Sequence, residues 1–140
     1  MKKAILLGLV LLFTANLIAQ GPLGTWKTID DETSEAKSHI EIYQEDGKYF
    51  GKIVKLLRVA EDTTCDKCPD DKKDQPLMGM VVMWDLEPYK DYWSYGRIMD
   101  PNNGKTYKCS VWLEDEKTLK VRGYLGFSAL GRNQTWHLVK

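Results

Sequence analysis

The sequence predicts an all-β protein, an eight-stranded antiparallel up-and-down barrel that follows an N-terminal signal peptide. Short β-rich segments separated by turn residues run from Gly24 to Val139, and no long segment repeats its apolar residues with helical spacing. Eight consecutive strands in this length leave a sandwich or a closed barrel as the economical solutions, and we favour the barrel. The first and last strands each carry a tryptophan, Trp26 and Trp136, which agrees with pairing between them.

Turn-forming residues divide the chain into these strands. Asp46-Gly47 is the tightest hairpin signal, because both residue types accept the positive φ of a two-residue turn. Asp100 to Gly104 is a second dense turn signal. In the third strand the apolar parity shifts between Ile53 and Leu57, which predicts a bulge. The expected strands are Gly24 to Asp30, His39 to Glu45, Lys48 to Leu57, Met80 to Leu86, Tyr92 to Met99, Lys105 to Leu113, Thr118 to Leu125 and Gln134 to Val139.

The N-terminal segment, residues 1–19, has the pattern of a secretory signal peptide. Lys2 and Lys3 precede an apolar run from Ala4 to Phe13, and Ala19 supplies the small residue that a signal peptidase requires. We therefore expect a single mature domain that begins at residue 20 and is secreted or periplasmic.

Charge and hydropathy exclude some classes of partner. The 140 residues contain 20 basic and 20 acidic side chains, so removal of the signal peptide with its two lysines leaves a net charge of minus two. This charge argues against nucleic acid as a partner. No stretch after the signal peptide approaches the roughly 20 apolar residues of a membrane span. We therefore expect no stable membrane span once the signal peptide is cleaved.

The segment from Arg58 to Leu77 is expected to form the one long loop, and it carries Cys65 and Cys68. In a secreted protein, a local disulfide between these cysteines is the leading interpretation. Because it closes a short ring, it would order the loop rather than hold the fold. Redox catalysis is disfavoured, because nearby acidic side chains would raise a thiol pKa instead of lowering it. These acidic residues are Asp62, Asp66, Asp70 and Asp71.

No cofactor, metal site or catalytic site is expected. Zinc needs four ligands, or three with an open position, and the further candidates Cys109, His39 and His137 are not spaced as a ligand pair. Cys109 shares its strand parity with apolar residues and is expected to be a buried small hydrophobe. The sequence contains no Gly-x-Ser-x-Gly, no glycine-rich phosphate loop and no His-Glu-x-x-His. We therefore do not expect an enzyme.

Strand alternation predicts which side chains face the barrel interior. An apolar, aromatic and sulfur-containing interior would suit a hydrophobic guest, although the same aromatic side chains can form an ordinary core. The expected inward sets are Met80, Val82, Trp84 and Leu86 on the fourth strand, Tyr107, Cys109, Val111 and Leu113 on the sixth, and Gln134, Trp136 and Leu138 on the last.

The fifth strand leaves two orientations open. If the face with Tyr95 and Arg97 points inward, Arg97 enters the barrel and needs a partner such as a ligand carboxylate. Arg122 on the seventh strand is the competing candidate. For either arginine, the favoured alternative is a solvent-facing side chain whose stem covers an aromatic ring. The candidate ligand-binding residues are Trp84, Tyr95, Arg97, Tyr107, Arg122 and Trp136.

Two resemblances add to this interpretation. Gly24-Thr25-Trp26 resembles the first-strand motif of lipocalins, in which an arginine late in the chain covers the tryptophan. Arg122 or Arg132 is the candidate for that role here, and the alternative is that Trp26 simply fills a barrel end.

Seven motifs taken in order are similar to a family of small secreted bacterial proteins, domain of unknown function 2147. They are Gly24-Thr-Trp26, Cys65-Asp-Lys-Cys68, Pro76-Leu-Met-Gly79, Gly96-Arg-Ile-Met-Asp-Pro101, Gly104-Lys-Thr-Tyr107, Val121-Arg-Gly-Tyr124 and Gln134-Thr-Trp136. The resemblance implies a lipocalin-like barrel in the bacterial envelope or outside the cell. It supplies no established activity, so it assigns no site residue.

The sequence therefore predicts a secreted or periplasmic lipocalin-like barrel that binds a small apolar or amphipathic ligand. The alternative is a solid barrel that acts as an envelope protein–protein interaction module without an internal ligand. A third hypothesis makes the loop from Cys65 to Leu77 a redox or metal element.

Overall fold

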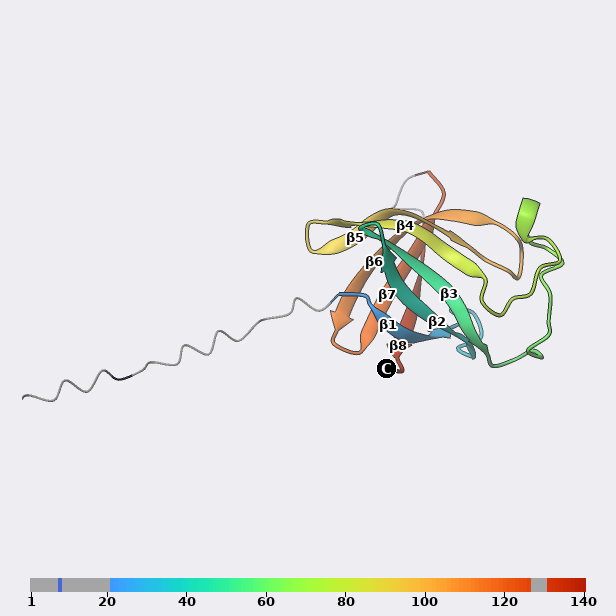
Figure 1. The fold of residues 1–140 in the computed structure, drawn as a ribbon, viewed down its shortest axis with the longest axis horizontal. Coiled ribbons are helices and arrows are strands. Elements are labelled where there is room, and N and C mark those ends of the chain that lie inside the picture. The colour runs from blue at the N-terminus through green and yellow to red at the C-terminus, as the bar shows by residue number, and fades with distance from the viewer. Residues whose placement is uncertain (1–7, 9–20, 127–130) are drawn as a thin grey trace, which may run out of the picture.

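A computed structural model describes Gly8, residues 21–126 and residues 131–140. The expected signal peptide lies, apart from Gly8, outside the described residues. Eight antiparallel strands close into a barrel in which each strand pairs with its sequence neighbours and the last pairs with the first (Figure 1). They are β1 (Gly24–Ile29), β2 (Ala36–Glu45), β3 (Lys48–Leu56), β4 (Val81–Tyr89), β5 (Tyr92–Met99), β6 (Thr106–Asp115), β7 (Thr118–Tyr124) and β8 (Arg132–Leu138). The predicted all-β, eight-stranded up-and-down barrel is confirmed.

The seam between β1 and β8 closes the barrel. Trp26 lies opposite Leu138, and Thr28 lies opposite Trp136. Beyond the paired strands, the Thr25 N–H donates to the Lys140 carbonyl at 2.8 Å. The expected pairing of the two Trp-containing strands is therefore confirmed.

The two ends of the barrel have different connections. At one end, called the closed end, the β2–β3, β4–β5 and β6–β7 connections are each two residues long. Asp46 and Gly47 in the first of these turns have φ values of 52° and 79°, the conformation that the Asp-Gly pair predicts. At the other end, called the mouth, the connections are residues 30–35, 57–80, 100–105 and 125–131.

The long connection at the mouth contains one short 3-10 helix, η1 (Asp70–Lys72). No described helix is long and apolar enough to cross a membrane.

Register shifts interrupt the inward and outward alternation in several strands. The β2–β3 register pairs His39 with Lys55 and Ile40 with Ile53, so Val54 is the extra residue of the predicted bulge. The other register shifts were not predicted, and two of them are each marked by a residue with positive φ. These residues are Asp85 in β4 (φ 60°) and Tyr95 in β5 (φ 63°).

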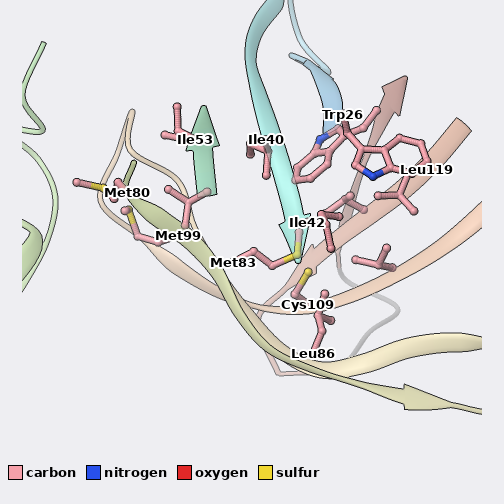
Figure 2. Packing of buried hydrophobic residues seen from close by; sticks show 14 of the residues in the cluster. Trp26, Ile40, Ile42, Ile53, Met80, Met83, Leu86, Met99, Cys109 and Leu119 are labelled. Carbon is pink, nitrogen blue, oxygen red and sulfur yellow. The ribbon is translucent and has the colours of Figure 1, made fainter. Parts of the chain in front are cut away.

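Buried side chains fill the closed half of the barrel. Trp26, Leu119, Ile42, Met83 and Cys109 are each at most 2% exposed. Figure 2 shows them gathered with Leu86, whereas Met80 and Met99 lie apart on the other side of the view. The indole N–H of Trp26 donates to the Pro22 carbonyl at 2.8 Å, so the chain before β1 helps to cover this end.

Candidate functional site

The half of the barrel next to the mouth is hollow. A cavity of about 750 Å³ extends inward from the mouth. This volume falls within the roughly 300–1,000 Å³ range of small-molecule sites. Its apolar wall is built by inward side chains of six strands, which are Ile40, Ile53, Val82, Ile98, Val121 and Trp136.

Trp136 lies at the boundary between the cavity and the packed half. Its side chain lines the cavity, and the residue is only 1% exposed. The indole N–H donates to the Gln134 side-chain oxygen at 3.0 Å, so the polar edge of the ring is satisfied inside the barrel. Gln134 also lines the cavity, and both residues belong to the face of β8 that alternation predicts to point inward. Leu138, the third member of that set, lies at the strand end and is 37% exposed.

A few polar groups interrupt the apolar wall. The hydroxyl groups of Thr28 and Ser38 are hydrogen-bonded across β1 and β2 at 2.9 Å, and both residues line the cavity. The hydroxyl oxygen of Tyr107 accepts a hydrogen bond from the Asn103 amide at 3.3 Å. An apolar wall with a few placed polar groups is the usual composition of a small-molecule pocket.

Ion pairs tie the rim of the mouth together. The Arg132 guanidinium lies 2.7 Å from the Asp31 carboxylate and 3.0 Å from that of Glu32, which links the start of β8 to the β1–β2 connection. The hydrogen bond and charge of Asp31, followed by the charge of Glu32, raise the pKa of Arg132. Because Arg132 is exposed, these contacts contribute little to stability, but they define the position of the rim.

The β1–β2 connection is itself ordered by Asp30. Its carboxylate accepts hydrogen bonds from the backbone N–H groups of Thr33 and Glu32, each at 2.9 Å. The bond from Thr33 is the largest cause of a lowered pKa for Asp30, ahead of a smaller opposing effect of burial. The negative side of the rim is therefore held in place by the backbone.

The long β3–β4 connection lies over one side of the mouth. The predicted disulfide between Cys65 and Cys68 is present, and both residues are buried. The Cys65 N–H donates to the Gln75 carbonyl at 2.9 Å, so the two arms of the loop pair with each other. Gly104 has a φ of 73°, and a Cβ there would collide with the Lys67 carbonyl. The loop thus packs directly against the β5–β6 turn.

Two of the six candidate ligand-binding residues lie at the cavity. Tyr107 and Trp136 line its wall, on strands whose alternation is regular at these positions.

The other four do not line the cavity, and the expected inward orientation of Trp84 is wrong. The Trp84 ring lies under the Lys72 ammonium, 5.1 Å from ring centroid to nitrogen. Tyr95 is 61% exposed and Arg97 is exposed as well, so the orientation that would bring Arg97 into the barrel is not adopted. In β4 the register shifts between Val81 and Met83, and the consecutive residues Val82 and Met83 are both buried, so the alternation reverses before Trp84. The bulges at Asp85 and Tyr95 interrupt it again in β4 and β5.

Arg122 alternates with the inward residue Val121 on β7 and therefore points outward, in agreement with the solvent-facing alternative. Its guanidinium donates to the Asn133 side-chain oxygen at 2.7 Å on the neighbouring strand. Arg132, the second candidate for covering Trp26, forms the rim ion pairs instead. Trp26 itself is buried at the closed end, in agreement with the alternative that it fills a barrel end.

Sequence reasoning missed the acidic partners at the rim. Asp31 and Arg132 are separated by 101 residues. Their contact depends on the closure of β8 onto β1, so no local pattern marks them as a pair. The run Asp30-Asp31-Glu32 immediately after a strand was the available signal, since it places negative charge at one barrel end.

The free cysteine, Cys109, lies in the packed half of the barrel rather than at the cavity (Figure 2). Burial raises the pKa of the Cys109 thiol to about 12, which makes it a poor nucleophile. Within residues 21–126 and 131–140, no three His, Cys, Asp or Glu side chains gather as a potential metal site.

The comparisons with known proteins agree with this architecture. The family model described as "Uncharacterized protein conserved in bacteria (DUF2147)" matches residues 24–138. The chain belongs to this family. No curated protein matches the chain in sequence.

A solved structure also resembles this DUF2147 protein. It is protein HP1028 from the human pathogen Helicobacter pylori, which is described as belonging to the lipocalin family. The TM-score is 0.74 at 19% sequence identity, with 84% of this chain and 82% of that chain covered. The similarity shows that the two proteins share the lipocalin-like barrel fold.

Proposed function

We propose that this DUF2147 protein binds a small apolar or amphipathic molecule in its barrel cavity, and that it does so outside the cytoplasm, as a secreted or periplasmic protein. The observation that carries the proposal is the hollow of about 750 Å³, which opens at the mouth and ends at Trp136. An eight-stranded barrel either fills its interior with side chains or encloses one small ligand. The hollow favours the second case over a solid barrel.

The distribution of polar groups indicates how a guest would lie. Ile40, Ile53 and Val121 offer an apolar wall away from the mouth, whereas Asp31 and Arg132 place charges at the rim. A molecule with an apolar tail and a polar head would bury the tail and leave the head at the rim. Burial of apolar surface contributes about 25 cal/mol per Å², so the tail would supply most of the binding energy.

The disulfide and the N-terminal sequence support the proposed compartment. Disulfides persist in oxidising environments such as the periplasm and the extracellular space. The Cys65–Cys68 bond and the signal-like segment at residues 1–19 both support export. Detection of the mature chain in a periplasmic or culture fraction, with its N-terminus determined by mass spectrometry, tests this part of the proposal.

Tryptophan emission provides the binding test. The mature protein is titrated with fatty acids of increasing chain length, and binding should shift or quench the emission of Trp136 at the cavity wall. Trp136→Phe should lose most of the change, while Trp84→Phe should keep it because that ring contacts Lys72 outside the cavity. The absence of any fluorescence or calorimetric response to every amphiphile would refute the proposal.

A cavity-filling variant supplies an independent check. Ile53→Trp adds volume to the apolar wall, so the variant should fold and yet bind the same fatty acid at least about tenfold more weakly, a difference of about 1.4 kcal/mol. An unchanged affinity in a folded variant would place the ligand elsewhere on the protein.

A tyrosine cluster on the outside favours the alternative, a protein-interaction module. Tyr89 packs edge-on against Tyr92 at 5.3 Å and against Tyr95 at 5.5 Å between ring centroids. Tyrosine is enriched at protein interfaces. Tyr95→Ser should weaken partner capture from envelope extracts if this surface is the functional one, and it should leave fatty-acid binding unchanged.

A further inference from the structure

Two methionine sulfurs from different parts of the chain lie against the Cys65–Cys68 disulfide of the long loop. Cys65 and Cys68 supply the disulfide, Met80 lies immediately before β4, and Met99 ends β5. The Cys68 sulfur lies 3.9 Å from that of Met80 and 3.8 Å from that of Met99. These are sulfur–sulfur contacts rather than hydrogen bonds, because a disulfide sulfur carries no proton. All four residues are buried.

The two cysteine-to-methionine separations match those of ligands that share one metal ion. Sulfur ligands lie about 2.3 Å from a tetrahedrally coordinated metal, which places neighbouring sulfurs about 3.8 Å apart. Cys68 therefore already lies at ligand spacing from both methionines. The C-x-x-C spacing of Cys65 and Cys68 is also a common spacing for two metal-binding thiolates.

We propose that reduction of the Cys65–Cys68 disulfide converts these four sulfur atoms into a binding site for one Cu(I) ion. A dithiol reductant supplies two electrons and two protons, is itself oxidised to a disulfide, and leaves two thiols on the protein. Cu(I) then displaces the two thiol protons and is bound by two thiolates and the two thioethers of Met80 and Met99. While the disulfide is intact, the site is closed to the metal.

The ligand set selects the metal. Zinc is bound in proteins by thiolate, imidazole and carboxylate groups, whereas soft thioether ligands favour Cu(I). Two of the four groups here are thioethers, so the site discriminates against zinc. All four residues are buried in the protein, and Cys65 and Met99 also line the cavity. The open mouth therefore provides an entry path.

The test compares methionine variants of the reduced mature protein. Under anaerobic conditions, Cu(I) is titrated in competition with a chromogenic Cu(I) chelator, and the sulfur neighbours of copper are counted by X-ray absorption. Met80→Leu and Met99→Leu keep the buried volume but remove one ligand each. Met83→Leu is the matched control, because Met83 is equally buried but lies in the closed half.

We expect the reduced wild-type protein to bind one Cu(I) with four sulfur neighbours. Each of the Met80 and Met99 variants should bind at least about tenfold more weakly, since even second-shell changes cost 10- to 100-fold. Met83→Leu should match the wild type, and the oxidised protein should not compete with the chelator. Cys65→Ser combined with Cys68→Ser should abolish binding.

Two results would overturn the proposal. One is the absence of Cu(I) binding by the reduced wild-type protein. The other is a double Met80→Leu, Met99→Leu variant that is folded by circular dichroism and binds Cu(I) as tightly as the wild type, with only two sulfur neighbours in both proteins. In that case the thiolates alone bind the metal. Fatty-acid titration of the oxidised variants separates this site from the proposed guest cavity, because it requires no reduction.

Discussion

The closed end and the mouth of this barrel are made from the same strands, yet one is packed and the other hollow. On β2, Ile42 lies in the packed half, while Ile40, two residues away on the same face, lines the cavity. On the inward face of β5, the Leu86 side chain occupies the space that a Cβ of residue 96 would need. At Gly123 of β7 the corresponding space is less crowded. The fold alone therefore does not make a cavity. The size of the inward side chains and the length of the connections at each end decide where it lies.

Thiol reactivity should show the largest difference between the two halves. Burial raises the Cys109 pKa from its ordinary value of 9.0 to about 12, which lowers the reactive thiolate fraction about a thousandfold at pH 8. We expect Cys109 of the native protein to be alkylated about a thousandfold more slowly than in the unfolded chain, as measured by mass spectrometry with the disulfide intact. Ile98→Cys, which places a thiol on the cavity wall, should react much faster. Equal rates for the two thiols would show that the closed end admits the reagent.

Truncation of the two β2 isoleucines should compare the packing directly. Ile-to-Ala substitutions in protein cores cost about 2–5 kcal/mol, and the cost is larger where the surroundings leave a new void. We expect Ile42→Ala to lower the free energy of unfolding by about 4 kcal/mol and Ile40→Ala by about 2 kcal/mol. Urea denaturation of the oxidised protein measures both. If Ile40→Ala costs as much as Ile42→Ala, the mouth half is packed as tightly as the closed half.

Addition of a methyl group, instead of its removal, should also cost more stability in the packed half than near the cavity. A Cβ at Gly96 would lie 2.7 Å from Leu86 Cγ and 3.0 Å from the Trp84 carbonyl oxygen, so Gly96→Ala should cost about 1–3 kcal/mol. At Gly123 the nearest atom, Cβ of Tyr107, would lie 3.4 Å away, and Gly123→Ala should stay within about 0.5 kcal/mol of the wild type. Thermal unfolding of the two variants is the measurement, and a reversed order would contradict it.

The smallest effect should come from His39 on the barrel wall. Burial, followed by the charges of Lys55 and Lys27, lowers the His39 pKa below 6.5. The unfolded chain therefore takes up this proton at a higher pH than the folded protein, so His39 contributes stability above pH 6.5 and loses it as the pH falls through its folded pKa. Replacement by His39→Gln should remove this part of the acid destabilisation in melting curves between pH 8 and pH 5. A steeper acid dependence in the variant would show the opposite sign.

The sequence was sufficient to predict where the strands lie, but not to predict which face of every strand points inward. Turn chemistry is local, so Asp46-Gly47 and Asp100 to Gly104 mark strand boundaries without knowledge of the rest of the fold. A bulge depends on how a strand pairs with its neighbours. Asp85 and Tyr95 each take a positive φ within a strand, which is uncommon for a bulky residue such as Tyr95 and is not marked by a turn signal at either position. With the register shift between Val81 and Met83, these irregularities explain why the alternation that placed Trp84 inward failed.

The site shows the same division between local and distant information. Tyr107 and Trp136 were predicted at the interior because their strands alternate regularly there. The contact between Cys68 and Met99 spans 31 residues and forms only when the long loop packs on the barrel. An inventory of cysteine and histidine ligands could not find it, since thioethers were left out of that inventory.

An even number of antiparallel strands returns the chain to the end from which it started. Thr25, next to the first residue of β1, is hydrogen-bonded to Lys140, and both lie at the closed end, away from the rim pair of Asp31 and Arg132. A tether attached at either terminus would therefore hold the barrel at its closed end and leave the mouth facing away from the tether. The protein can be fixed to a sensor chip or fused to a carrier through either tail without obstruction of the entrance.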